Sequence, residues 1–600
     1  MRRQTHFLRS SVLGALSNVY TTSSGTRLRR AAREEIQYPP NFYLFFLFLF
    51  YPEYHTQLRS RSIDERSFRC SFTMKFTAAV AACLSLLSTA YADSRVDTSS
   101  SKVVLPSTFK PPQNFRNANL VHIISLEKNY VKESINVLIE NISEEPQDEY
   151  FLPFTSEQME KVGGFEVKDR KNSEVVGFDI DAVEYDSLRK VEPSALFCYR
   201  PGEASTNVRH GSDTQFYRIK LPAPLASGSQ QILGISFYYL NVLKALPASI
   251  DQTDKQYLVH TFSAYCPSAY STLKQKTEVK LPSSEAPEYT KIAGNEETKE
   301  FPVKQGSKLT YGPFPEVSAG ASSLVKVRYE FNKPVTHVSQ LERDIEVSHW
   351  GGNVAFEERY TLFHHGANLS SQFSRVKWAQ SQYISPQTFA LKEMKFVLGA
   401  GSKDAYFTDV IGNVSTSRFR TSKREAVLEL KPRYPIFGGW KYPFTVGWNA
   451  DSNNYLKKSG DKFLLNIPLI EGPKQAEGVE YEHVDVRVIL PEGAENIEFH
   501  TSVPGSSITE HSVDIVRTYL DTVGRTVLTI KARNLVDELR DRELIVSYEY
   551  STVAALRKPF VIFSSTMAVF VGTWLLSKLD KYRNGTRNPE AFDVKQGPDK

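Results

Sequence analysis

Residues 354–363 read VAFEERYTLF, and this run decides the predicted fold class. Val354, Phe356, Tyr360 and Leu362 are large apolar residues at positions of one parity, and mostly polar residues lie between them. Because successive side chains of a strand point to opposite faces of the sheet, residues of one parity share a face. The run therefore predicts a β-strand with one buried face.

The same period-two pattern recurs on both sides of this run, and turn-forming residues separate its copies. The other predicted strands are 120–126, 135–139, 216–221, 231–239, 324–331, 463–469, 484–490, 526–532 and 543–550. Amphipathic helix patterns are short, as at 155–162. We therefore predict a mainly β protein with two lumenal β-sandwich-type domains followed by a single C-terminal transmembrane helix.

The segment 282–308 gives the best domain boundary, because it is rich in Glu, Lys, Pro and Gly and poor in large apolar residues. A linker and an exposed loop both fit this composition, and we favour the linker. The strand-rich part of the chain is too long for one core. We expect β-domain 1 at 93–281 and β-domain 2 at 309–556.

Near the C-terminus, residues 559–576 read PFVIFSSTMAVFVGTWLL, which is 18 residues without a charge. At 1.5 Å per residue a helix of this length spans about 27 Å, enough to cross the hydrocarbon core. We predict a transmembrane helix at 557–578. Basic residues are more numerous after the run than before it, so the tail, 579–600, is expected in the cytosol.

Small residues recur every fourth position in this helix, at Ser564, Ala568 and Gly572. Such a ridge lets a second transmembrane helix approach closely. The alternative is a lipid-facing anchor in which the spacing arises by chance.

Residues 74–92 have the pattern of a secretory signal peptide. Met74 and Lys75 form a basic start, residues 76–87 are apolar, and Ala90-Tyr91-Ala92 is a small-x-small cleavage site. We expect cleavage between Ala92 and Asp93, with the following β-domains in the lumen.

The first 73 residues contain eleven Arg, no Lys and five acidic residues, so they account for the whole formal net charge of +5. We interpret 1–73 as a non-native N-terminal extension, and we expect no nucleic-acid partner from that charge. A mitochondrial presequence also fits the composition of 1–33, but it leaves the later signal peptide and membrane helix without a purpose.

Four Cys occur in the chain, of which Cys198 and Cys266 lie in the predicted lumenal part. In an oxidising compartment these two could form a disulfide, and two buried free thiols are the alternative. Asn141, Asn368 and Asn413 stand in Asn-x-Ser motifs and are predicted N-glycosylation sites. Asn584 also matches, but it lies beyond the membrane helix and should stay unmodified.

Most enzyme motifs are missing from the sequence, including HExxH, GxSxG, CxxC, the P-loop and GxGxxG. His364 and His365 are adjacent, so in a strand their rings face opposite ways and cannot bind one metal together. Asp179 and Asp181 form the Asp-x-Asp pattern with which some glycosyltransferases hold a cation. A solvated strand face explains this pair equally simply, and we predict no catalytic, metal or cofactor site.

The densest unusual stretches are LERDIEVSHWGGN at 341–353, SRVKW at 374–378 and KPRYPIFGGWK at 431–441. Four of the five Trp fall between Trp350 and Trp448. A well-packed second sandwich explains this enrichment, and an aromatic docking surface for a protein or a glycan is the alternative. These three stretches resemble the ribophorin I family, and the resemblance extends over nearly all of 103–576.

The resemblance implies a non-catalytic subunit of the oligosaccharyltransferase complex of the endoplasmic reticulum. That complex transfers a preassembled oligosaccharide from dolichyl diphosphate to Asn of Asn-x-Ser/Thr in nascent proteins. The implied partners are a multi-spanning catalytic subunit, other small membrane subunits, nascent polypeptides and the membrane. Implied roles are stabilising the complex and presenting acceptor chains. The short cytosolic tail matches fungal members rather than animal ones.

Two other classes of function remain open from the residues alone. One is a type I cargo receptor or lumenal chaperone. The other is a membrane-tethered glycan-processing enzyme that uses acidic residues such as Asp179 and Asp181.

Overall fold

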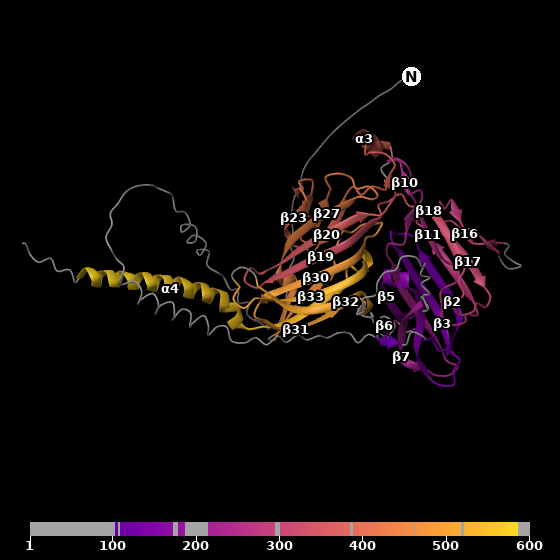
Figure 1. Cartoon of the computed structure of the whole chain (residues 1–600), viewed down its shortest axis with the longest axis horizontal. Helices are drawn as coiled ribbons and strands as arrows, with labels where there is room; N and C mark the ends of the chain where they lie inside the picture. The colour runs from indigo at the N-terminus through magenta and orange to yellow at the C-terminus, as the bar shows by residue number, and fades with distance from the viewer. Residues whose placement is uncertain are drawn as a thin grey trace, which may run out of the picture. The chain divides into compact units, whose positions relative to one another are not determined.

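A computed structural model describes residues 103–105, 109–171, 178–185, 214–293, 300–384, 388–460, 462–517 and 521–585. These residues form sheets of up to eight strands and few helices, so the predicted mainly β class is confirmed (Figure 1). Every predicted strand overlaps a strand of the structure. The signal peptide at 74–92, its cleavage site and the extension at 1–73 lie outside the described residues.

The first β region, between 103 and 335, is built around a sheet of order β16-β17-β12-β2-β3-β8-β5. Its strands are β2 (Phe115–Ser125), β3 (Val131–Asn141), β5 (Val162–Asp169), β8 (Gln230–Tyr239), β12 (Gln275–Lys280), β16 (Val303–Gln305) and β17 (Lys308–Phe314). Two four-stranded sheets accompany it. One has β1 (Val103–Leu105), β6 (Asp179–Tyr185), β7 (Thr214–Leu225) and β4 (Gln147–Thr155), and the other β13 (Glu288–Tyr289), β18 (Leu324–Glu330), β11 (Tyr257–Ser263) and β9 (Lys244–Ala245).

The second β region, between 336 and 550, is built around a sheet of order β24-β23-β27-β20-β19-β30-β33-β32. Its strands are β19 (Thr336–Ser348), β20 (Asn353–His364), β23 (Lys403–Asp409), β24 (Gly412–Asn413), β27 (Lys441–Asp451), β30 (Glu480–Glu492), β32 (Ile508–Val516) and β33 (Arg525–Val536). Two smaller sheets share its core. They contain β22 (Met394–Leu398), β25 (Arg418–Thr421) and β26 (Ala426–Leu430), and β28 (Leu456–Ser459), β29 (Lys462–Pro468), β31 (Ala494–Thr501) and β34 (Glu543–Tyr550).

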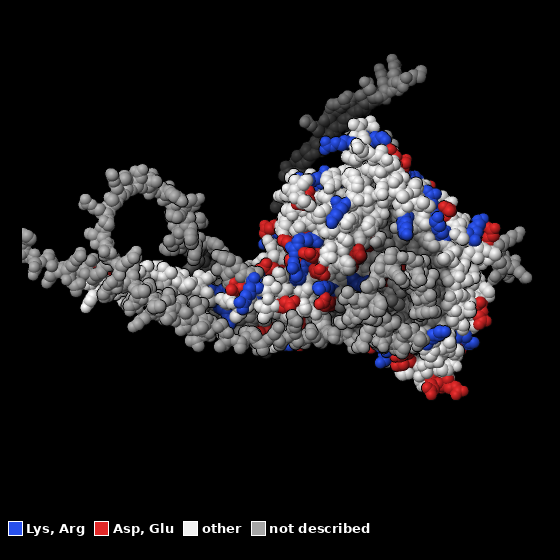
Figure 2. Space-filling model, in the orientation of Figure 1, with Lys and Arg blue, Asp and Glu red and all other residues white. Residues whose placement is uncertain are grey.

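Strand β20 follows the predicted alternation, since Val354, Phe356, Tyr360 and Leu362 are buried and the residues between them are half-buried. One member of the buried series is charged, namely Glu358, whose side chain is fully buried. On the opposite face of this sheet, Lys and Arg mix with Asp and Glu over β19, β20 and β30 (Figure 2). The pattern thus separates a core face from a charged face, as the sequence predicts.

The segment 282–308 does not behave as a free linker in the structure. It contributes β13, β14 (Ile292–Ala293), β15 (Glu300–Phe301) and β16, and β13 pairs with β18. Phe301 is 2% exposed within the first core, which extends to Val335. Backbone pairing therefore draws a polar segment into the first β region. The domain bounds 93–281 and 309–556 remain a proposal.

The two β regions contact each other through both polar and apolar groups, and Leu240 and Ile250 of the first region pack into hydrophobic clusters of the second. Strand β10 (Ser249–Ile250) pairs in parallel with β21 (Asn368–Leu369). The Tyr130 hydroxyl donates to Asp537 at 2.5 Å, and Asn534 Nδ2 donates to the Val162 carbonyl at 2.9 Å. Strands β5 and β33 lie side by side in this contact (Figure 1).

Three α-helices accompany the sheets in the described residues. Helix α2 (Ser156–Lys161) confirms the short predicted helix, and Thr155 and Gln158 form a capping box at its start. Helix α3 is Arg375–Ile384, and α4 is Thr552–Gly585. Of the described helices, α4 is long and apolar enough to cross a membrane over Thr552–Tyr582, and it contains the predicted span 557–578.

Candidate functional site

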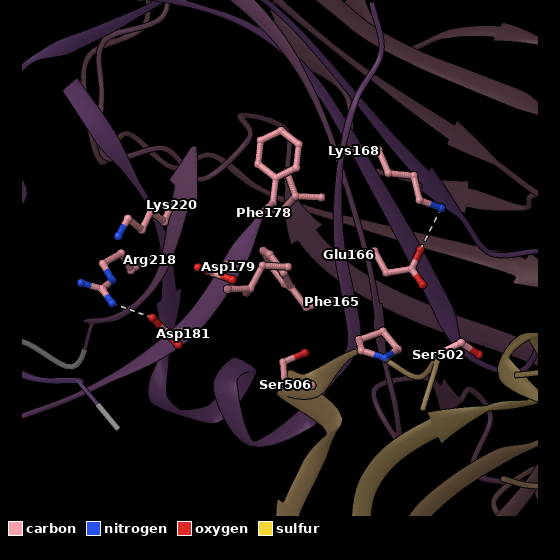
Figure 3. A pocket seen from close by; sticks show the side chains of 14 residues that line it. Phe165, Glu166, Lys168, Phe178, Asp179, Asp181, Arg218, Lys220, Ser502 and Ser506 are labelled. Atoms are coloured by element: carbon pink, nitrogen blue, oxygen red, sulfur yellow. Dashed lines mark hydrogen bonds and ion pairs between the residues drawn. The ribbon is translucent and has the colours of Figure 1, made fainter. Parts of the chain in front are cut away.

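A pocket of about 580 Å³ opens between the first β region and residues 502–506 of the second (Figure 3). Strands β5, β6 and β7 each contribute one wall. The side chains that line it include Phe165, Glu166, Lys168, Phe178, Asp179, Ile180, Asp181, Arg218, Lys220, Ser502, Pro504 and Ser506. The pocket thus combines an apolar wall with charged groups of both signs, as ligand pockets commonly do.

Four of the charged side chains that line the pocket form two ion pairs. Arg218 donates to Asp181 at 2.6 Å (Figure 3). It also donates to Glu149 at 3.0 Å. The hydrogen bond with Asp181 is the largest cause of the raised pKa of Arg218. Lys168 and Glu166 form a second ion pair at 3.1 Å. These pairs place positive and negative charges next to each other on the lining of the pocket.

Asp179 and Asp181 both line this pocket. They lie two residues apart on β6, so their side chains leave the same face of the strand. Asp179 is exposed, and Asp181 faces the Arg218 guanidinium. A divalent cation at this carboxylate would be repelled by the fixed positive charge of Arg218. The Asp181 carboxylate is therefore already paired with a cation of the protein itself.

A second cluster was not foreseen from the sequence. His337, His365 and Glu480 bring potential metal-ligand atoms within 4.8 Å of one another. His364, by contrast, faces the carbonyl of Phe389, so the adjacent histidines diverge as predicted. His337 is the second residue of β19 and Glu480 is the first residue of β30, and the two are partners in the parallel pairing of these strands. Only sheet pairing brings these residues together, because they are 143 positions apart.

The side chains of the His337 cluster form a hydrogen-bond network with one another. His337 Nδ1 lies 2.9 Å from Glu480 and Nε2 lies 3.0 Å from Glu482. Burial lowers the pKa of His337, but the two carboxylates outweigh burial and raise it. Both ring nitrogens of His337 therefore already face carboxylate oxygens. The ring also stacks on His365 at 4.4 Å, so their in-plane lone pairs do not converge.

The tryptophan-rich stretches mostly serve packing. Trp448 is 1% exposed in the second core, and Trp378 and Trp440 pack against Phe437 in a smaller cluster. Trp350 is the exception, with 65% of its surface exposed in the turn between β19 and β20. Three of these four side chains therefore fit the packing interpretation, and one remains on the surface.

Among the remaining predicted residues, Cys266 is buried, and burial raises the pKa of its thiol. Cys198 lies outside the described residues, so the disulfide stays a prediction. Ser564, Ala568 and Gly572 lie along α4, whose membrane span is uncovered in the described chain. Their packing role also stays a prediction.

The three predicted glycosylation sites differ in exposure. Asn368 and Asn413 are exposed, but Asn141 is 0% exposed. The Asn141 amide donates to the carbonyls of Glu145 and Leu225, at 2.9 and 2.7 Å. A glycan on this nitrogen would remove one of these bonds and has no path to solvent. The structure narrows the prediction to Asn368 and Asn413.

We therefore expect glycopeptide mapping of the mature protein to find glycans on Asn368, Asn413 or both, and none on Asn141. In gels, Asn368→Gln and Asn413→Gln should each remove one glycan shift where that site is occupied. Asn141→Gln is the matched control and should leave mobility unchanged. A glycan recovered on Asn141 would contradict the buried geometry.

A comparison with models of protein families shows to which family this chain belongs. The model of the ribophorin I family matches residues 115–577, which include both β regions and most of α4. The chain belongs to the ribophorin I family. The resemblance seen in the three aromatic stretches is thereby confirmed.

Individual relatives carry a common name, dolichyl-diphosphooligosaccharide–protein glycosyltransferase subunit 1. The Caenorhabditis elegans protein is 34% identical over 369 residues, which are 61% of this chain and 60% of the relative. The Schizosaccharomyces pombe protein is 28% identical over 466 residues, 77% of this chain and 95% of the relative. Subunit 1B of Arabidopsis thaliana is 28% identical over 479 residues, 79% and 95% of the two chains. The chain thus spans about three fifths of the worm relative and nearly all of the other two.

Proposed function

We propose that this chain is an accessory, non-catalytic subunit of the dolichyl-diphosphooligosaccharide–protein glycosyltransferase complex, which N-glycosylates nascent proteins. The observation that carries the proposal is the family match over 115–577, together with three relatives that bear the subunit 1 name. The match includes the folded β regions as well as the helix, so it rests on the whole architecture. The other subunits of that complex are the partners this implies.

The proposal that this chain is non-catalytic rests on the surroundings of two groups, the Asp179 and Asp181 pair and the His337 ring. Asp181 is engaged by Arg218, and the His337 ring is engaged by two carboxylates. Transfer from a lipid-linked donor requires a metal-bearing acidic site at the membrane face. We assign that site to a multi-spanning partner subunit, and to this chain the stabilisation of the complex and the presentation of acceptor polypeptides. The pocket between the two β regions is the candidate contact for an acceptor segment.

The topology we propose is that of a type I protein of the endoplasmic reticulum membrane. Helix α4 crosses the bilayer, the β regions lie in the lumen and the C-terminus lies in the cytosol. Lys578, Lys581 and Arg583 follow the apolar run, which supports this orientation.

Affinity purification of the full chain in mild detergent tests the function. We expect a multi-spanning glycosyltransferase to co-purify, and cells depleted of the chain to lose glycans at a subset of Asn-x-Ser/Thr sites. Isolation without any glycosyltransferase would favour a cargo receptor or chaperone. Sugar transfer by the isolated chain would contradict the non-catalytic assignment.

The ridge on α4 provides a separate prediction about assembly. Replacing Ala568 and Gly572 together with Leu should keep the helix in the membrane but weaken its contact with a partner helix. Close helix contacts of this kind contribute about 1–2 kcal/mol, so recovery of the complex should fall roughly tenfold. At 100° per residue, Thr566 and Thr573 lie on the opposite face. Thr566→Leu with Thr573→Leu is therefore the control. Undiminished recovery of the Ala568 and Gly572 variant would place assembly in the β regions instead.

A further inference from the structure

The first turn of α4 contains a backbone carbonyl that the helix itself cannot satisfy. In an α-helix the Ala555 carbonyl accepts from the N–H of the fourth following residue, which here is Pro559. Proline has no N–H, so this carbonyl is left without its intrahelical donor. The indole N–H of Trp350 donates to it instead, at 2.9 Å. Trp350 therefore supplies the hydrogen bond that Pro559 cannot, although the two residues are more than 200 positions apart.

The start of α4 is also tied to the second β region by a charged contact. Lys558 Nζ lies 2.5 Å from Asp521, whose side chain is fully buried, and 3.8 Å from Glu492. Glu492 accepts the backbone N–H groups of Thr522 and Val523, both at 2.7 Å. These bonds hold the start of α4 against the end of β30 and the residues just before β33. They therefore fix the position, or height, of Trp350 along the axis of α4.

That height corresponds to the headgroup layer of a bilayer. Ala555 precedes the apolar run by four residues, or about 6 Å along the helix axis. Each headgroup layer is about 5–8 Å thick, given about 30 Å of hydrocarbon in a membrane of about 40–45 Å. An indole combines an apolar body with one polar N–H, and Trp is enriched at this depth.

The surroundings of Trp350 have the composition of such an interface. Val553 and Leu556 of α4 are 77% and 59% exposed, so the apolar surface continues above the run toward Trp350. Arg557 is exposed beside them. Basic groups appear where α4 meets the sheets (Figure 2).

We propose that Trp350 anchors the second β region to the lumenal headgroup layer of the membrane, with its N–H satisfying the carbonyl that Pro559 leaves free. The partner of this surface is the lipid itself. The anchor sets the height and tilt of the β regions above the bilayer. This inference rests on the proposed membrane topology of α4.

The test uses the full chain in phosphatidylcholine vesicles that contain a headgroup spin-labelled lipid, which quenches nearby indoles. Trp574 lies near the other end of the apolar run, so Trp574→Phe is the background for all variants. We expect Trp350→Phe to reduce headgroup quenching by about half or more, because the other three Trp pack in hydrophobic clusters of the second β region. Trp378→Phe, which removes a half-buried indole of α3, is the control and should leave quenching unchanged.

Two outcomes would overturn the anchor. Quenching of Trp350 by aqueous iodide rather than by lipid would place it in water, and quenching by neither would place it against protein. Flotation of the vesicles after an alkaline wash separates these outcomes from a failure of the topology, because a chain that does not float lacks a membrane-spanning α4.

Protease cleavage at the start of α4 tests the coupling between Trp350 and Pro559. Trp350→Phe should increase this cleavage, because it leaves the Ala555 carbonyl without a donor. In a Pro559→Ala background the restored N–H of residue 559 can donate to that carbonyl, so Trp350→Phe should increase cleavage less. An equal effect in both backgrounds would contradict the coupling.

Discussion

Replacing Arg343 with Met is expected to destabilise the second β region by about 3–5 kcal/mol, because it leaves buried carboxylates without their counter-charge. Arg343 and Glu358 are both 0% exposed and form an ion pair across β19 and β20. Arg343 also reaches Glu471 at 3.2 Å. The free energy of unfolding in urea, followed by the fluorescence of the buried Trp448, measures the effect.

The packing around Arg343 explains why the loss should be large. Its guanidinium lies over the rings of Phe356 and Trp448, with centroids at 5.2 and 5.8 Å. The second oxygen of Glu358 accepts from the Tyr360 hydroxyl at 2.5 Å. Every polar partner in this cluster is shielded from water, so none can be replaced by a solvent contact.

Arg359 offers a matched control on the opposite face of the same sheet. It pairs with Glu342 at 3.0 Å and Asp344 at 2.7 Å, but its side chain is 35% exposed. Arg359→Met should cost about 0–1 kcal/mol, because water and salt screen such pairs. Adding Glu358→Gln to Arg343→Met should restore part of the lost stability, since it removes one uncompensated charge. Equal losses for Arg343→Met and Arg359→Met would contradict the assigned burial.

A second expected result is a loss of stability in mild acid that depends on His364. Burial lowers the pKa of this histidine from 6.5 to about 4. Its Nδ1 accepts from the Gly366 N–H at 3.0 Å, and its Nε2 faces the Phe389 carbonyl at 2.6 Å. A proton on Nδ1 would break the first bond and place a charge in the core.

The sign of the pH effect follows from the pKa of His364 in the two states, which is 6.5 in the unfolded chain and about 4 in the folded chain. Above pH 6.5 the ring is neutral in both the folded and the unfolded chain, so it contributes no pH dependence. Below 6.5 the unfolded chain binds the proton and the folded chain does not. Stability is therefore lost as the pH falls, by roughly 3 kcal/mol when it reaches about 4.

Urea unfolding of the full chain at a series of pH values checks this result. His364→Gln should reduce the slope of stability against pH between 6.5 and 4. His260 is also buried with its pKa lowered to about 4, so its Gln variant should reduce the slope similarly. His337 gives the opposite sign, because its raised pKa means that stability is lost as the pH rises through it. An unchanged slope in His364→Gln would show that the ring accepts a proton in the folded chain.

The strands and α4 were predictable because their signals are local. Period-two alternation marked β20, and the length of an uncharged run marked α4. Neither signal needs knowledge of a distant residue. The three aromatic stretches also identified the family, since long specific motifs are read directly from the chain.

The segment 282–308 shows where composition misleads. Its polar residues indicate a linker, but the backbone groups of β13 and β16 pair with neighbouring strands. Backbone hydrogen bonding is nearly independent of side-chain polarity, so a polar segment can complete a sheet. Composition therefore predicted exposure without predicting the pairing.

Local sequence patterns are enough to give the mainly β class, the membrane-length helix and the membership of the ribophorin I family. Tertiary contacts are needed for four further features, namely the burial of Arg343 and Glu358, the contact between His337 and Glu480, the inaccessibility of Asn141 and the hydrogen bond from Trp350 to Ala555. In each of these cases a polar group depends on a partner that strand pairing or tertiary packing brings near it. Periodicity fixes which face a residue occupies, whereas the partner on that face is fixed by contacts between segments far apart in the chain.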